Sequence, residues 1–169
     1  MNPTRIAMPR RGFLALAAVA GLSACGFELR RAPVFAFKSL AVPGTSAFVN
    51  QLRRNLRTAG NLELVAPERA DSAEAILDIL GEDRDQVVLS TDSAGSVREL
   101  QLRLRVRFRL RTPAGKELLS GGEIQQTRDM SYNETSALAK EGEAELLFRD
   151  MQNDIAQQML RRLAAVKQL

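Results

Sequence analysis

Residues 100–111, LQLRLRVRFRLR, alternate between apolar and polar side chains almost without exception. Because successive side chains of a β-strand point to opposite faces, this period of two predicts a half-buried strand. Its apolar side chains belong against a core, and its other face carries five arginines. We call these residues the arginine row: Arg103, Arg105, Arg107, Arg109 and Arg111. The chain must therefore form a sheet with one packed face and one charged face that meets water or a partner.

The composition narrows the chemistry that such a chain can perform. The 169 residues are 45% hydrophobic and include no histidine, so the commonest metal ligand and the commonest general base are missing. No glycine-rich phosphate loop or serine nucleophile motif is found. We therefore expect no catalytic site, no metal site and no cofactor. A hydrolase built on carboxylates such as Glu141 and Glu145 stays open, although pairs at helical spacing are usually solvated surface.

The first 24 residues are predicted to be a cleaved lipoprotein signal peptide. Arg5, Arg10 and Arg11 precede an apolar run, residues 12–22, that is too short to span a bilayer of about 30 Å. Leu-Ser-Ala-Cys then resembles the bacterial lipobox, which implies acylation of Cys25 and an anchor in a membrane. The alternative is a buried cysteine after an uncleaved segment. Both the general secretory and the twin-arginine export routes remain open.

Removal of the signal peptide changes the charge balance. The full chain carries 24 basic and 20 acidic residues; cleavage leaves 21 basic against 20 acidic residues and a net charge of +1. A nucleic-acid partner is therefore disfavoured, both by charge and by compartment. Glycine rather than aspartate follows Cys25, which in bacterial lipoproteins favours the outer membrane. Residues 25–169 are expected to form a single domain on the periplasmic side.

The rest of the pattern predicts an α+β fold. We expect strands near 34–42 and 61–65, one long bent strand or a strand pair over 73–90 with a bulge at Gly81, and a hairpin of 100–111 with 116–130. Helices are expected over 45–60, capped by Thr45 or Ser46, and from about residue 131 to the end of the chain. Both pack on one face of a small, about four-stranded, mostly antiparallel or mixed sheet. The stripe expected to be buried on the long helix comprises Leu138, Leu146, Leu147, Met151, Ile155, Met159, Leu163 and Val166.

The hairpin suggests partners for part of the arginine row. If Thr112 pairs with Lys116, then Arg111 faces Glu117 and Arg105 faces Glu123. Arg103, Arg107 and Arg109 would then face uncharged residues. These three are therefore candidates for contact with an anionic ligand or a partner.

Two segments, LSACGFELR and YNETSALAKEGEAELLFRDMQNDIAQQMLRRL, resemble the LptE family of lipopolysaccharide-assembly lipoproteins. The resemblance extends over about residues 25–166. It implies two helices on a small mixed sheet, a place in the outer membrane as a plug inside an LptD-like β-barrel protein, support of that barrel's assembly, binding of lipopolysaccharide, and no catalysis. It also implies that Lys140, within Ala-Leu-Ala-Lys, and Arg98 contact lipopolysaccharide.

The arginine row fits this implied location. Large outer-membrane barrels have polar, water-filled interiors, and arginine binds phosphate through two parallel hydrogen bonds. The role of Arg103, Arg107 and Arg109 follows from this reasoning and not from the family. The alternative is a generic outer-membrane lipoprotein that scaffolds another envelope complex.

Overall fold

A computed structural model describes residues 33–168. The predicted signal peptide and Cys25 lie outside these residues. All the elements described below belong to one unit, Ala32–Leu169. No helix within residues 33–168 has both the length and the apolar character needed to cross a membrane.

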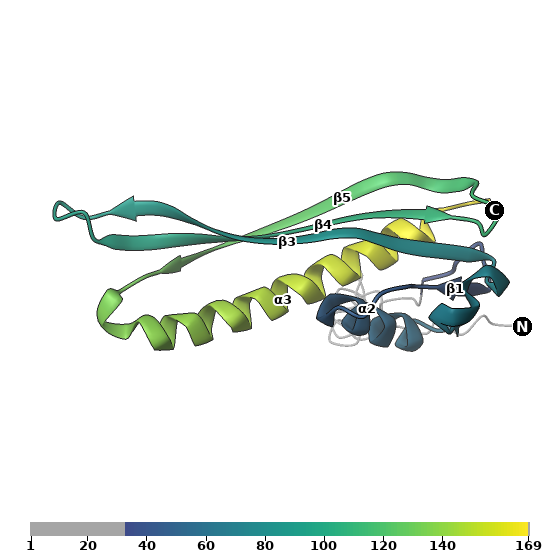
Figure 1. Ribbon diagram of the computed structural model, residues 1–169, viewed down its shortest axis with the longest axis horizontal. Helices are drawn as coiled ribbons and strands as arrows, with labels where there is room; N and C mark the ends of the chain where they lie inside the picture. Colours follow the sequence, from purple (N-terminus) through teal and green to yellow (C-terminus); the bar gives the residue numbers. More distant parts are fainter. Residues whose placement is uncertain (1–32, 169) are drawn as a thin grey trace, which may run out of the picture. The chain divides into compact units, whose positions relative to one another are not determined.

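The sheet has five strands in the order β2-β1-β3-β4-β5. The short strands β1 (Ser39–Ala41) and β2 (Glu63–Val65) run parallel, and β1 also runs parallel to β3 (Ala75–Thr91). The long strands β3, β4 (Val97–Arg111) and β5 (Glu117–Ser131) form an antiparallel meander (Figure 1). The mixed α+β prediction is confirmed, with one strand more than expected. Residues 73–90 contribute one long strand, and its register shifts between Ile79 and Gly81 as the glycine suggested.

Two helices and two short 3₁₀ turns complete the unit. Helix α2 (Ala47–Thr58) begins after Ser46, whose hydroxyl accepts a hydrogen bond from the Val49 amide at 3.1 Å. Helix α3 (Ala137–Ala164) follows the turn η2 (Glu134–Ser136), and η1 (Pro67–Ser72) joins β2 to β3. Both helices cover the same face of the sheet (Figure 1). This arrangement confirms the prediction of one helical face and one open face.

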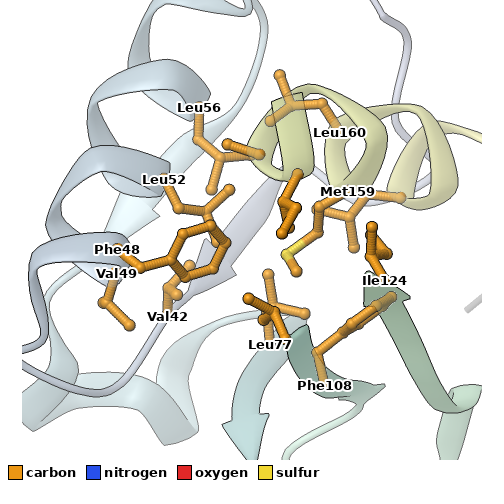
Figure 2. Packing of buried hydrophobic residues seen from close by; sticks show 14 of the residues in the cluster. Val42, Phe48, Val49, Leu52, Leu56, Leu77, Phe108, Ile124, Met159 and Leu160 are labelled. Atoms are coloured by element: carbon orange, nitrogen blue, oxygen red, sulfur yellow. The ribbon is translucent and has the colours of Figure 1, made fainter. Parts of the chain in front are cut away.

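The core lies between that sheet face and the two helices. Five even-numbered residues of the alternating segment are its β4 members, each fully or almost fully buried: Leu102, Leu104, Val106, Phe108 and Leu110. Helix α2 adds Phe48, Val49, Leu52 and Leu56, as its apolar stripe predicted. Figure 2 shows Leu52 and Phe48 of α2 meeting Met159 of α3 above Leu77 and Phe108 of the sheet. Burial of each such side chain contributes about 1.5–3 kcal/mol.

The predicted stripe of α3 is correct only in its second half. Met151, Ile155, Met159 and Leu163 are buried, and Leu147 and Val166 pack at the edge of the core. The other two are exposed: Leu138 by 83% and Leu146 by 60%. In this first half, the buried positions are Ala144 and Phe148. At 3.6 residues per turn, Leu146 lies about 200° around the helix from both of them, so it faces away from the sheet.

Candidate functional site

The open face of the sheet carries the arginine row between two rows of acids. In the observed register, every arginine has a carboxylate directly opposite on a neighbouring strand. On β3 these pairs are Arg103 with Asp85, Arg105 with Asp83 and Arg109 with Asp78; on β5 they are Arg107 with Glu123 and Arg111 with Glu117. We call this surface the arginine-row face. It is balanced in charge, one to one, rather than cationic.

The predicted hairpin register is correct at its closed end and wrong farther along. Thr112 bonds to Lys116 at 2.8 Å and Arg111 pairs with Glu117. Beyond them, two register shifts in β5 move the partners, so Arg105 faces Gln125 and Arg107 faces Glu123. One shift falls between Glu117 and Leu119, and the other between Leu119 and Gly122, beside the two glycines that favour a bulge. The expected ion pair survives on the diagonal, because Arg105 Nε still lies 3.5 Å from Glu123 Oε1.

The interpretation that Arg107 and Arg109 lack charged partners is wrong. Arg109 Nε lies 2.9 Å from Asp78 Oδ2, and Arg107 Nη2 lies 3.7 Å from Asp83 Oδ2. Arg103 donates to Gln101 at 2.8 Å and makes no ion pair within residues 33–168. The missing partners are on β3, whose segment DILGEDRD holds four acids around the Gly81 bulge; Asp78, Asp83 and Asp85 are the three that pair with the arginine row. Their spacing was visible in the sequence, but only the pairing of β3 with β4 places them beside the arginines.

Asp78 is the most enclosed acid of this face. Its side chain is 17% exposed, and its Oδ2 accepts hydrogen bonds from Arg109 Nε at 2.9 Å and Arg111 Nε at 2.8 Å. Burial raises the pKa of Asp78, but the hydrogen bonds and charges of Arg111 and Arg109 outweigh it, and the net pKa is lowered. The same bond with Asp78 raises the pKa of Arg111. Asp78 and Arg111 therefore stabilise each other in their charged forms.

Arg107 is the most accessible of the ion-paired arginines in the arginine row, with a side chain that is 53% exposed. Its guanidinium lies across Gly81, where an added Cβ would be 2.5 Å from Nη2. The backbone at the β3 bulge thus gives the side chain a flat surface on which to lie. Arg105, Arg109 and Arg111 are partly exposed as well, so the row lies at the surface and not inside the core.

The two residues implicated through the resemblance lie at one end of the sheet. Lys140, near the start of α3, donates to Ser131 Oγ at 3.0 Å, and Ser131 pairs with Glu99 next to Arg98. The Arg98 carbonyl accepts from the Tyr132 amide at 2.7 Å. Strand β4 therefore begins where β5 ends and α3 starts, which brings Arg98 and Lys140 to a common region.

Both cations of this region already have acidic partners. Lys140 Nζ lies 2.8 Å from Glu143 Oε2, three residues farther along the same helix, and the lysine side chain is only 19% exposed. Arg98 Nη2 lies 2.5 Å from Asp92 Oδ2 in the turn between β3 and β4. Hydrogen bonds from the Ser96 amide first, and then Arg98 and the Ala94 amide, lower the pKa of Asp92 despite some desolvation. An anionic ligand that binds Arg98 and Lys140 would therefore have to displace the carboxylates of Asp92 and Glu143.

No cluster of three or more metal-ligating side chains occurs in the part of the chain that the structure describes. Both surfaces present guanidinium or ammonium groups held beside carboxylates. Such groups bind anionic oxygen through charge-assisted hydrogen bonds.

Comparison with known proteins identifies relatives of the same architecture. Lipoprotein B from Nitrosomonas europaea is 34% identical, with 83% of this chain and 91% of that chain covered at a TM-score of 0.70. Rare lipoprotein B from Shewanella oneidensis is 25% identical, covering 75% of this chain and 94% of that chain at 0.64. A minor lipoprotein from Acinetobacter baumannii shares the fold at 20% identity, 78% and 94% coverage and a TM-score of 0.63. No curated protein sequence gave a match.

The sequence also matches a family profile over most of its length. Residues 37–163 match the family described as LptE, lipopolysaccharide assembly. The matched range runs from the residues before β1 to the last turn of α3, and so includes all five strands and both helices. The chain belongs to the LptE family of lipopolysaccharide-assembly lipoproteins.

Proposed function

We propose that this protein is an outer-membrane lipoprotein, anchored through acylated Cys25, that binds lipopolysaccharide and supports and plugs an LptD-like β-barrel. It acts by binding and catalyses no reaction. The family assignment supports the process, lipopolysaccharide assembly. We infer the two partners, lipopolysaccharide and the barrel, and the residues that contact each of them from the surfaces described above.

The observation that carries the lipid part is the convergence of Arg98 and Lys140. These residues lie 42 positions apart in the sequence, yet Ser131 and Tyr132 connect both to the end of β5. Each cation is held by one carboxylate, Asp92 or Glu143. A phosphate of lipopolysaccharide carries more charge and more acceptor oxygens than a carboxylate, so it can replace these partners.

The arginine-row face is the proposed contact with the barrel wall. A barrel interior is polar and wet, and a surface of alternating charge rows can form cross-interface ion pairs without burying unpaired charge. Within it, Arg103, Arg107 and Arg109 are the proposed contact residues. Arg107 is the most exposed of the ion-paired arginines in the row, and Arg103 has no ion pair to break among the described residues.

A charge-reversal variant tests the lipid site. Arg98→Asp with Lys140→Asp should weaken binding of purified lipopolysaccharide at least tenfold, because two cations that contact phosphate become anions. The control is Arg57→Asp with Lys167→Asp, which changes the net charge equally at exposed positions outside this region. Binding is measured by titration, with circular dichroism to verify folding. Equal binding by the folded test variant and the wild type would refute the site.

Co-purification tests the partner. The tagged full chain, isolated from the membranes of its own cells, should bring down one large outer-membrane β-barrel in stoichiometric amount. Recovery of only small periplasmic proteins would instead support the alternative of a scaffold for another envelope complex.

A further inference from the structure

A hollow of about 280 Å³ lies between helices α2 and α3. Its lining comprises Ala47, Gln51, Arg54, Arg149, Gln152 and Asn153. The helix period explains the lining, because the three α2 residues share one side of that helix and the three α3 residues share one side of theirs. Since a water molecule occupies about 30 Å³, the hollow has room for a small oxyanion with part of its hydration shell.

The lining carries two positive charges and no carboxylate. Arg54 contributes from α2 and Arg149 from α3. Arg54 donates to the amide oxygen of Gln51. Arg149 makes no ion pair or hydrogen bond within residues 33–168. Two like charges that face one hollow repel each other, and a bound anion turns that repulsion into attraction. Every arginine of the arginine row, by contrast, has a carboxylate opposite it.

The floor of the hollow holds the side-chain amide of Gln152. Gln152 is 7% exposed, the only polar residue among those buried in the described chain. Its side chain makes no hydrogen bond to any residue in the range 33–168. The neighbouring pair is satisfied, because Gln51 Nε2 donates to Asn153 Oδ1 at 2.9 Å and joins the two helices. Arg105 Nε is the only buried side-chain nitrogen or oxygen without a hydrogen-bond partner among the described residues, so the Gln152 amide is open to the hollow and can donate to a group bound there.

From these observations we propose that the α2–α3 hollow is a binding site for a phosphate group. Arg54 and Arg149 grip its oxygens from two sides through charge-assisted hydrogen bonds, and the Gln152 amide donates from the floor. Phosphate fits better than a carboxylate, because its oxygens project in several directions and can meet donors from both helices at once.

The hollow is separate from the proposed lipopolysaccharide site. Arg149 lies nine residues beyond Lys140, about 13–14 Å along α3 at 1.5 Å per residue. The inference therefore stands independently of the proposed function. The phosphate could come from the free ion or from a phosphorylated lipid headgroup, and the experiment separates these sources.

The test is titration of the purified full chain with inorganic phosphate, followed through the side-chain NMR signals of arginine and glutamine. Wild type should saturate with shifts at Arg54, Arg149 and Gln152. Arg54→Gln with Arg149→Gln should weaken binding at least tenfold. The matched control, Arg57→Gln with Arg161→Gln, removes the same charge from exposed positions of the same two helices and should bind as wild type. Equal weakening in both double variants, or no saturation of wild type, would overturn the proposal.

Gln152→Leu separates binding from structure. The Gln152 amide makes no hydrogen bond to another described residue, so its replacement by an apolar side chain of similar size should change the unfolding temperature little, while phosphate affinity falls severalfold. A fall in unfolding temperature with unchanged affinity would assign Gln152 a purely structural role and would overturn its part in the site. Addition of lipopolysaccharide identifies the source: displacement of phosphate from the wild type supports a lipid headgroup as ligand, and simultaneous binding supports the free ion. The Arg98→Asp and Lys140→Asp variant should retain phosphate binding even if it loses lipopolysaccharide.

Discussion

The two faces of strand β4 come from one alternating segment and meet opposite surroundings. Its even-numbered residues from Leu102 to Leu110 are excluded from water beneath α2 and α3, and the arginines of the row lie at the surface among carboxylates. The helical face gains stability from burial, which is worth about 1.5–3 kcal/mol for each large side chain. Exposed ion pairs gain only about 0–1 kcal/mol each. The stability of the fold therefore depends on the helical face, and charge changes on the arginine-row face cost little stability.

Asp78 is the exception that links the two faces. It lies on the open face, yet it is the most enclosed acid there and bonds two arginines at once. Its neighbour in sequence, Leu77, is fully buried in the core. This end of the sheet should therefore be the one place on the arginine-row face where a charge change costs measurable stability.

The largest expected effect is on the helical face. Phe108→Ala should lower the free energy of unfolding by about 3–5 kcal/mol, because it opens a cavity between the sheet and α3. It also removes the ring over which the Arg162 guanidinium lies at 5.8 Å. Urea unfolding followed by circular dichroism measures the change. A loss below about 1 kcal/mol would contradict the assignment of stability to this face.

A smaller effect is expected at the enclosed acid. Asp78→Asn should cost about 1–2 kcal/mol, because Arg109 and Arg111 lose a shared, charge-assisted acceptor. The control is Asp83→Asn, whose carboxylate is more exposed and lies 3.7 Å from Arg107; it should cost no more than about 0.5 kcal/mol. Equal losses of unfolding free energy in the two variants would show that Asp78 contributes no more stability than an exposed acid of the same face.

The smallest effect should appear as a dependence on pH. The pKa of Asp78 is lowered in the folded protein, so its ion pairs contribute fully above the ordinary aspartate pKa of about 3.9. That contribution is lost as the pH falls through the lowered pKa of the folded state. Urea unfolding between neutral pH and strongly acidic pH should therefore show a shallower acid loss in Asp78→Asn than in the wild type. Parallel curves for the two proteins would contradict a stabilising role for the bonds of Asp78 with Arg109 and Arg111.

The alternating segment and the amphipathic helix α2 could be predicted because each follows a local period. The strand register could not, because the shifts near Gly121 and Gly122 depend on the pairing of β4 with β5. The acids of β3 can be read from the sequence, but their pairing with the arginines of β4 cannot, because the bulge at Gly81 decides which β3 side chains lie on the open face. Leu138 and Leu146 were misplaced because the first half of α3 uses Ala144 and Phe148 against the sheet. The hollow between α2 and α3 has no local signature, because its arginines come from helices about 95 residues apart.

The partner role of the arginine-row face is tested most directly by cross-linking in the membrane. A photo-reactive residue replaces Gln125, which lies opposite Arg105 on that face, in the full chain expressed in its own cells. A second protein carries the same residue at Arg161 of α3 as a reference outside the face. We predict that position 125 cross-links to a large outer-membrane β-barrel more efficiently than position 161. Cross-linking to the barrel from position 161 alone, or from neither position, would contradict this assignment.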